Sequence, residues 1–120
     1  MTQENAYANL ELTRTQVDAT TGPVVVDFGT NWCGFCQAAR PLIDAAFDSY
    51  PDVRHIRVED GSGRPLGRSF RVKLWPTLIF MRDGIEVSRL VRPENTGSVE
   101  AALEAIETAP GKEQSLMPNA

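Results

Sequence analysis

The two cysteines of the chain lie three positions apart, in the pentapeptide WCGFC at residues 32–36. An apolar run at residues 24–28 (VVVDF) precedes them, and apolar residues at helical spacing follow from residue 34 to about residue 49. A β-branched and aromatic run of this kind predicts a strand buried on both faces. The cysteines therefore stand at a strand-to-helix junction, where two thiols are placed to exchange a disulfide with another protein.

The rest of the chain alternates strands with helices. Strands that alternate with helices and close on a hairpin specify a mixed β-sheet covered by helices on both faces, so the predicted fold class is α/β. A proline at position 41 is expected to kink the helix that contains it. The expected helices are residues 10–19 (N-cap Thr13), 34–49, 64–70 and 96–108, and the expected strands are residues 24–28, 53–58, 77–81 and 86–91, the last two joined by a turn at Asp83-Gly84.

The length and the ends of the chain define one domain. At 120 residues the chain can bury a core without disulfide staples. Residues 1–9 are small and polar, and residues 109–120 carry two prolines and a glycine. We therefore expect a flexible amino terminus over residues 1–9, a folded domain over residues 10–108 and a flexible tail over residues 109–120.

Charge and hydropathy exclude several classes of partner. A formal net charge of −4 argues against a nucleic-acid surface, and no apolar stretch approaches membrane-spanning length. The amino terminus MTQEN lacks the basic and apolar segments of a secretory signal, so the expected compartment is the cytoplasm. There a cysteine pair is more often catalytic or metal-binding than structural. We expect a monomer that binds neither nucleic acid nor membrane.

With these elements in place, the chain resembles the thioredoxin family. The matching residues are Val26-Asp27-Phe28, the pentapeptide at 32–36, Pro41, Trp75-Pro76-Thr77 and Asp83-Gly84, in the family's order over roughly residues 10–107. The resemblance implies the thioredoxin fold and the reduction of protein disulfides, with no cofactor beyond the redox-active Cys33–Cys36 pair. It also implies disulfide-containing client proteins as substrates and an upstream donor similar to thioredoxin reductase as a partner.

By this resemblance Cys33 is the exposed nucleophile and Cys36 the buried resolving thiol. Unpaired backbone N–H groups and the helix dipole would stabilise a thiolate on Cys33, and the thiolate is the attacking species. Asp27 would lie beneath Cys36 and exchange its proton, because a carboxylate in a buried strand is costly unless it is paired, hydrogen-bonded or protonated. The alternative for Asp27 is a buried acid that is hydrogen-bonded without a part in the chemistry.

The resemblance also implies a substrate-binding surface. Pro76 resembles the family's cis-proline, whose backbone, with that of Trp75, would hold an extended client peptide by strand-like hydrogen bonds. The implied substrate-binding residues are Trp32, Gly34, Phe35, Trp75, Pro76 and Arg92.

Several positions depart from the family pattern. Phe35 replaces a proline, which predicts a pair somewhat less reducing than that of a general thioredoxin. Gly29 replaces a tryptophan, and we hypothesise that the large ring of Trp75 compensates for it. Arg92 replaces a glycine that lets substrates approach closely. Together these changes predict a narrow, aromatic and basic rim that favours a restricted set of clients.

Two residues near the predicted acid are interpreted separately. Arg57 falls where the family often has a lysine close to the buried carboxylate. Because arginine stays charged, Arg57 is predicted to tune Asp27 by holding it ionised, without shuttling a proton. His55, the one histidine of the chain, is expected to be a surface or packing residue rather than a ligand or a base.

Three other functions are consistent with parts of the sequence. The cysteine pair could be half of a zinc or iron–sulfur site, but two cysteines and one histidine would need a second chain to complete four ligands. The fold could serve as a chaperone-like interaction module with dispensable cysteines. The protein could also be an oxidase or isomerase in an exported context. A cytoplasmic disulfide reductase accounts for the most residues.

Overall fold

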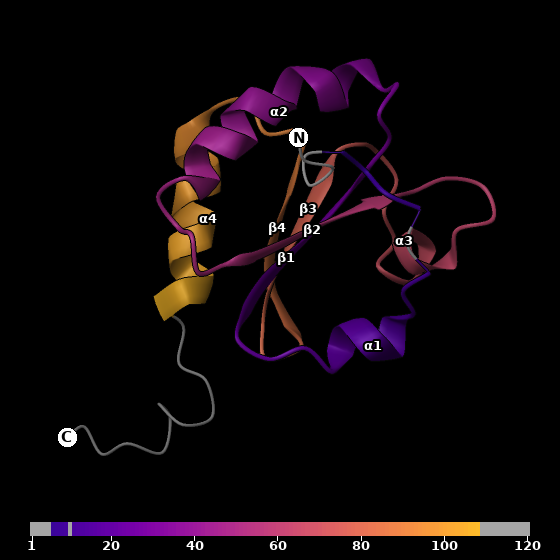
Figure 1. The fold of residues 1–120 in the computed structure, drawn as a ribbon, viewed down its shortest axis with the longest axis horizontal. Coiled ribbons are helices and arrows are strands. Elements are labelled where there is room, and N and C mark those ends of the chain that lie inside the picture. Colours follow the sequence, from indigo (N-terminus) through magenta and orange to yellow (C-terminus); the bar gives the residue numbers. More distant parts are fainter. Residues whose placement is uncertain (1–5, 10, 109–120) are drawn as a thin grey trace.

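The structure, a computed structural model, describes residues 6–9 and 11–108. Within these residues a four-stranded sheet is flanked by helices on both faces, as Figure 1 shows. The predicted α/β class, with a central sheet flanked by helices on both faces, is therefore confirmed. The strands are β1 (Pro23–Gly29), β2 (Arg54–Glu59), β3 (Thr77–Arg82) and β4 (Ile85–Val91), and the helices are α1 (Arg14–Asp18), α2 (Gly34–Phe47), α3 (Pro65–Ser69) and α4 (Thr96–Thr108).

The sheet is mixed, with the strand order β2-β1-β3-β4. β1 runs parallel to β2, in a register that pairs Asp27 with Arg57, and antiparallel to β3. β3 and β4 form the hairpin that the sequence predicted, and both turn residues, Asp83 and Gly84, have positive φ. β1 is therefore a central strand, and its side chains alternate between two covered faces.

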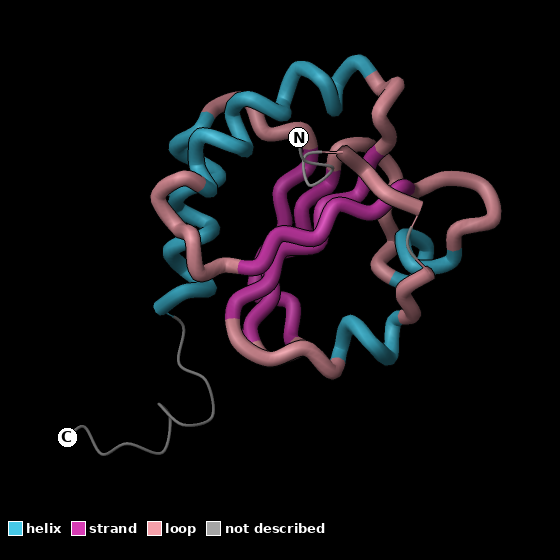
Figure 2. Tube along the Cα trace, in the orientation of Figure 1, coloured by secondary structure: helices cyan, strands magenta, loops and turns pink. Residues whose placement is uncertain are grey.

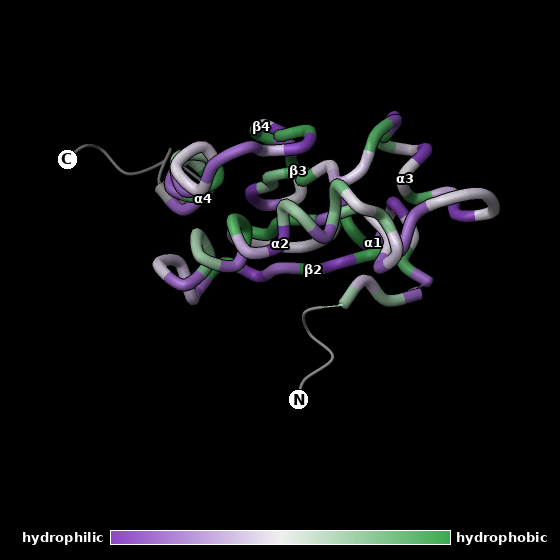
Figure 3. Tube along the Cα trace, turned by 90° about the horizontal axis from the view of Figure 1, so that it is seen from above, coloured by the Kyte–Doolittle hydropathy of each residue, from purple (hydrophilic) through white to green (hydrophobic). Residues whose placement is uncertain are grey.

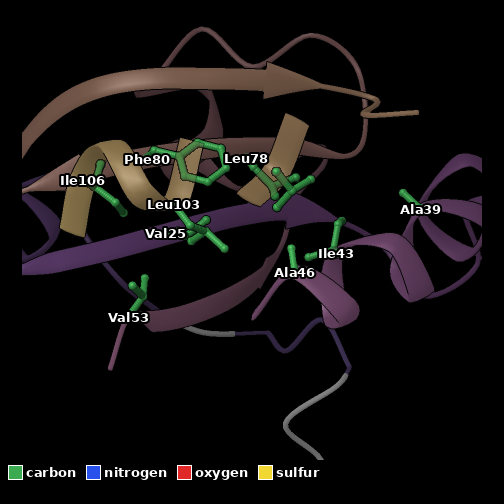
Figure 4. Close-up of a cluster of buried hydrophobic side chains, with 10 residues drawn as sticks. Val25, Ala39, Ile43, Ala46, Val53, Leu78, Phe80, Leu103 and Ile106 are labelled. Atoms are coloured by element: carbon green, nitrogen blue, oxygen red, sulfur yellow. The ribbon is translucent and has the colours of Figure 1, made fainter. Parts of the chain in front are cut away.

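The two faces of the sheet carry separate apolar layers. Figure 2 shows the strands lying between the two groups of helices. One layer, drawn in Figure 4, packs α2 and α4 on the sheet and includes Val25, Ile43, Phe80 and Leu103. The other packs α1 and α3 against the opposite face. Its buried members are Val17, Val24, Val26, Phe28, Val58, Leu66, Phe70, Ile79 and Met81.

The observed helices differ from the predicted ones mainly at their ends. α1 begins only at Arg14, because Thr13 caps it in a capping box with Gln16. α2 continues through Pro41, so the lost backbone donor does not end the helix. None of the helices among the described residues is long and apolar enough to cross a membrane.

The amino-terminal segment differs from the expectation of flexibility over residues 1–9. Residues 1–5 lie outside the described residues, and so does the predicted tail at 109–120. Residues 6–9, however, lie along the outer edge of β2. The backbone N–H of Ala8 donates to the Arg57 carbonyl at 3.3 Å, and the N–H of Glu59 donates to the Ala8 carbonyl at 2.8 Å. This short parallel pairing brings Tyr7, which is 5% exposed, to the end of β1 that carries the site.

Candidate active site

The cysteine pair lies at the start of α2, directly after β1. Cys33 is the N-cap of α2, and its sulfur accepts a hydrogen bond from the backbone N–H of Cys36 at 3.3 Å. A sulfur in this position lies beside the backbone N–H groups of the first helical turn, at the positive end of the helix dipole. Both thiols are free, and both are buried: Cys33 is 8% exposed and Cys36 is 1% exposed. The implied burial of Cys36 is thus confirmed, whereas the implied exposure of Cys33 is wrong for this reduced state. The structure thus offers Cys33 to an approaching disulfide more readily than Cys36.

Cys36 is held in its thiol form. Burial, followed by the hydrogen bond to Cys33, raises its pKa from an ordinary value of 9.0 to about 12. A thiol with such a pKa is a poor nucleophile at neutral pH unless a base takes its proton during the attack. The site therefore needs a proton acceptor near Cys36.

Asp27 is fully buried and has three partners. Its Oδ1 accepts a hydrogen bond from the Tyr7 hydroxyl at 2.7 Å. Its Oδ2 lies 2.9 Å from His55 Nε2 and accepts a hydrogen bond from Arg57 Nε at 3.3 Å. The predicted contact between Asp27 and Arg57 is thus present, and such partners offset the cost of burying a carboxylate.

His55 is a packing residue, as predicted, and it makes one contact that the sequence did not predict. Its ring does pack, because it stacks on Phe47 with centroids 4.0 Å apart and planes 10° from parallel. It also contacts the buried acid through Nε2. β2 is the most polar strand of the sheet in Figure 3, and His55 and Arg57 lie two positions apart on it. Two such residues point to the same face of a strand, which here is the face toward Asp27.

Tyr7 occupies the space that Gly29 leaves open. A Cβ built on Gly29 would lie 2.6 Å from Cys36 Sγ, 2.7 Å from Tyr7 Cζ and 2.9 Å from Tyr7 Oη. The ring nearest Gly29 is therefore that of Tyr7, whereas Trp75 packs against the cluster of Tyr7 and the two cysteines. The hypothesis that Trp75 compensates for the missing tryptophan stays a prediction. Tyr7 is held there by Asn31, which exchanges two hydrogen bonds with the Tyr7 backbone, at 2.9 Å and 3.0 Å.

Pro76 lies in the loop before β3, next to the cysteines. The Trp75–Pro76 peptide bond is cis. Pro76 is buried, and the ring of Trp75 packs against the cluster formed by Tyr7 and the two cysteines. The indole N–H of Trp75 donates to Asp60 Oδ2 at 2.9 Å, which fixes the plane of the ring. The loop thus places the Trp75 ring beside the pair.

The predicted rim residues come together around the pair. Trp32 is 72% exposed, and its ring meets that of Trp75 edge to face with centroids 5.7 Å apart. Phe35 is 56% exposed, and the Arg92 guanidinium lies 3.7 Å from its ring centroid. Gly34, also exposed, lies between these aromatic residues in the chain. The opening to the cysteines is therefore lined by three aromatic rings and one cation.

Arg92 binds the backbone of the loop before β3. Its Nε donates to the Trp75 carbonyl at 2.8 Å, and its backbone N–H donates to the Pro76 carbonyl at 2.9 Å. Its φ of 52° lies in the left-handed region, where a non-glycine residue carries strain. An arginine thus stands in a backbone conformation that favours glycine, and its side chain occupies the carbonyl of Trp75.

Among the described residues, no cluster of three or more His, Cys, Asp or Glu side chains is arranged to hold a metal ion. The sequence predicted the cysteines, the rim and the pairing of Asp27 with Arg57, and the structure brings these residues together. It missed Tyr7 and the contact of His55 with Asp27. The two-residue spacing of His55 and Arg57 was a usable signal, and so was the space beside Gly29.

Comparisons with known proteins agree with this geometry. A family model described as Thioredoxin matches residues 6–105. Thioredoxin Asp f 28 of Aspergillus fumigatus is 31% identical over 87 residues, which cover 72% of this chain and 81% of that protein. The thioredoxin of Chlamydia trachomatis is 39% identical over 72 residues, covering 59% and 70%. The reduced structure of thioredoxin 2 from Pseudomonas aeruginosa PAO1 is similar with a TM-score of 0.78 at 52% identity, covering 85% of this chain and 94% of that one.

Proposed function

The chain belongs to the thioredoxin family, and on that premise we propose that it reduces the disulfides of a restricted set of client proteins through Cys33 and Cys36. The reaction class of the protein is thiol–disulfide exchange, which is the chemistry of the family. The alternative, a binding module with dispensable cysteines, is not favoured. The observation that carries the proposal is the unequal placement of the two thiols, with Cys33 at the helix terminus and Cys36 buried behind it. That asymmetry gives the order of attack.

The proposed reaction has two exchange steps. The Cys33 thiolate attacks one sulfur of the client disulfide, forming a mixed disulfide and releasing the other client sulfur as a thiolate. Cys36 then loses its proton to Asp27 and attacks the Cys33 sulfur. The client leaves as its second thiolate, and a Cys33–Cys36 disulfide remains. Two electrons have passed to the client, whose leaving thiolates take up two protons.

The rim supports the restriction to few clients. An extended client peptide pairing with the Trp75 backbone must displace the Arg92 side chain, which already donates to the Trp75 carbonyl. It must also fit beside Trp32 and Phe35. Clients with a carboxylate near the disulfide could pair with the displaced guanidinium, so their binding would cost least.

The second half of the cycle needs an electron donor. The Cys33–Cys36 disulfide must be reduced again, and we propose a dithiol donor of the thioredoxin-reductase type. Together with a cytoplasmic location and a monomeric state, this donor is part of the proposal. The pair itself would be the redox group, with no further cofactor.

We also propose that the pair is less reducing than that of a general thioredoxin. Phe35 supplies a backbone N–H at the helix start where proline has none, and its ring lies under Arg92. Both features change the relative stability of the dithiol and disulfide forms. For this two-electron couple, about 30 mV corresponds to about 1.4 kcal/mol. A titration against glutathione should give a potential above about −270 mV, and a value at or below that would contradict this point.

The proposed function is tested by insulin reduction with dithiothreitol as the electron source. The wild type should accelerate reduction, whereas Cys33→Ser should be inactive and Cys36→Ser should stop at one turnover. A protein-disulfide client isolated on the Cys36→Ser variant should be bonded to Cys33. Acceleration by the Cys33→Ser, Cys36→Ser double variant would overturn the proposal.

A further inference from the structure

The proposed reaction leaves one proton without a route. Cys36 must lose its thiol proton before it can attack Cys33, and burial, followed by the hydrogen bond to Cys33, raises the pKa of that thiol to about 12. Asp27 is the buried acid of this region. Both residues belong to the described part of the chain. Within that part, no direct hydrogen bond joins the Cys36 thiol to the Asp27 carboxylate.

The Tyr7 hydroxyl is hydrogen-bonded to one of these two groups and lies near the other. It donates to Asp27 Oδ1 at 2.7 Å. A Cβ atom built on Gly29 would lie 2.6 Å from Cys36 Sγ and 2.9 Å from the Tyr7 oxygen, so both atoms border the same small volume. A hydroxyl is both a donor and an acceptor. While Tyr7 donates to the carboxylate, its oxygen can still accept a proton. The described residues show no hydrogen bond between that oxygen and the Cys36 thiol, which lies in the same buried cluster, so a transfer requires the two atoms to close together.

The partners of Asp27 divide its two oxygens. Oδ2 is occupied by His55 Nε2 and by Arg57 Nε, whereas Oδ1 faces the hydroxyl of Tyr7. Arg57 stays protonated and cannot accept a proton. The oxygen that remains for an incoming proton is therefore Oδ1, and access to it passes through Tyr7.

We propose that Tyr7 is a relay residue that carries the proton of Cys36 to Asp27 during the resolving step. The S–H bond of Cys36 breaks and its proton binds to Tyr7 Oη, while the Oη–H bond breaks and that proton binds to Asp27 Oδ1. Tyr7 begins and ends as a neutral phenol. Asp27 ends as a carboxylic acid, and the Cys36 thiolate attacks Cys33. This inference rests on the proposed function, because it concerns only the second exchange step.

The surroundings of Tyr7 favour a concerted transfer over a free phenolate. Burial, followed by the negative charge of Asp27, holds the pKa of Tyr7 well above its ordinary value. The hydroxyl therefore gives up its proton only as it receives another. The titratable and charged groups that face Tyr7 and its acceptor are Asp27 from β1, His55 and Arg57 from β2, Cys33 and Cys36 from α2, and Asp44 of α2, which pairs with Arg57 at 2.8 Å.

The test separates the two exchange steps in one reaction. Reduced protein mixed with 5,5′-dithiobis(2-nitrobenzoate) should release one equivalent of thionitrobenzoate when Cys33 attacks and a second when Cys36 resolves the mixed disulfide. Tyr7→Phe keeps the ring and removes the hydroxyl, so the second phase should slow by about 10- to 100-fold while the first is unchanged. Tyr50→Phe is the matched control, because the Tyr50 hydroxyl donates to Glu104 in α4, at 3.4 Å, and not to a residue of the cysteine site. Both phases should keep their rates in this variant.

The pH profile separates a relay from a structural role. In Tyr7→Phe, solvent hydroxide must remove the proton of Cys36, so the second phase should rise close to tenfold per pH unit between pH 7 and 9. The wild type should respond less steeply. Asp27→Asn should slow the same phase, and adding Tyr7→Phe to it should slow the phase little further, since both changes interrupt one path.

The outcomes distinguish this inference from the proposed function. Loss of the first phase in the wild type would overturn the proposed function itself. A second phase of wild-type rate and pH profile in Tyr7→Phe would overturn the relay alone. If Tyr7→Phe does not fold, a second variant is used, in which 3,5-difluorotyrosine replaces Tyr7 and Tyr50→Phe removes the other tyrosine of the chain. This protein keeps the ring at position 7 and has a more acidic hydroxyl there. Its second phase should change rate while its first does not, and an unchanged second phase would equally overturn the relay.

Discussion

Replacement of Gly29 by alanine should destabilise the protein by displacing Tyr7 from the site. The added Cβ would lie 2.6 Å from Cys36 Sγ, 2.7 Å from Tyr7 Cζ and 2.9 Å from Tyr7 Oη, all closer than real Cβ contacts. The sulfur belongs to a helix anchored on the core. The Tyr7 ring belongs to a short segment paired with the edge of the sheet, so it is the group expected to move.

The magnitude follows from two losses. Overpacking a well-filled site costs about 1–3 kcal/mol. Moving the ring also breaks the hydrogen bond between the Tyr7 hydroxyl and the buried Asp27 carboxylate, and bonds to charged groups contribute about 1.5–3 kcal/mol. We therefore expect Gly29→Ala to lower the free energy of unfolding by about 3–5 kcal/mol, measured by denaturant unfolding of the reduced protein.

Two further variants make this prediction specific. Gly34→Ala is the matched control, because a Cβ there meets nothing within 4 Å and alanine is favoured over glycine in a helix by about 0.5–1 kcal/mol. In a Tyr7→Ala background, Gly29→Ala should cost at least about 1 kcal/mol less than in the wild type, because the two sites are in contact. Additive losses, or a Gly29→Ala protein as stable as the wild type, would refute the placement of the Tyr7 ring.

Three further predictions concern pH, charge and the rim. The pKa of Cys36 is raised to about 12 in the folded protein, so its contribution to the free energy of unfolding should be complete below pH 9 and should fall as the pH rises toward 12. Denaturant unfolding of the reduced wild type should show this loss of stability, and the Cys36→Ser variant should show less of it. Arg57→Ala should lower stability by about 3–5 kcal/mol, because it removes the cationic partner of the buried Asp27 carboxylate and leaves that carboxylate only Tyr7 and His55. Asp44→Asn, at the more exposed end of the same network, should cost under about 1 kcal/mol, and similar losses in both variants would contradict this prediction. Arg92→Gly should relieve backbone strain and uncover the Trp75 carbonyl, so kcat/KM for insulin, a client without special fit, should rise; a fall would argue that Arg92 binds clients rather than excluding them.

The strands, the helices and the cysteine site could be predicted because their signals are local. The β-branched run at 24–28 and the helical periodicity after Gly34 place the pentapeptide at their junction, and the turn at Asp83-Gly84 fixes the hairpin. The predicted pairing of Asp27 with Arg57 rested on the resemblance. Its physical basis is the register of two parallel neighbours, β1 and β2, which sets the two residues side by side.

The position of Tyr7 could not be predicted from local patterns. Its contacts with Asp27 and with Asn31 join residues 20 and 24 positions apart, and the segment around it is small, polar and without periodicity. A segment of this kind becomes ordered only where a matching space exists elsewhere. Here that space results from the missing side chain of Gly29. The glycine at position 29 and the ordered position of Tyr7 therefore explain each other.

The central claim, that Cys33 attacks and Cys36 resolves, is tested most directly by intact-protein and peptide mass spectrometry of trapped intermediates. Reduced Cys36→Ser protein is mixed with a disulfide client, quenched in acid and digested without reductant. The account predicts one client bonded to Cys33 for each chain, and no adduct when the Cys33→Ser variant is treated in the same way. An adduct on Cys36 in Cys33→Ser protein that forms as fast as the adduct on Cys33 would contradict it.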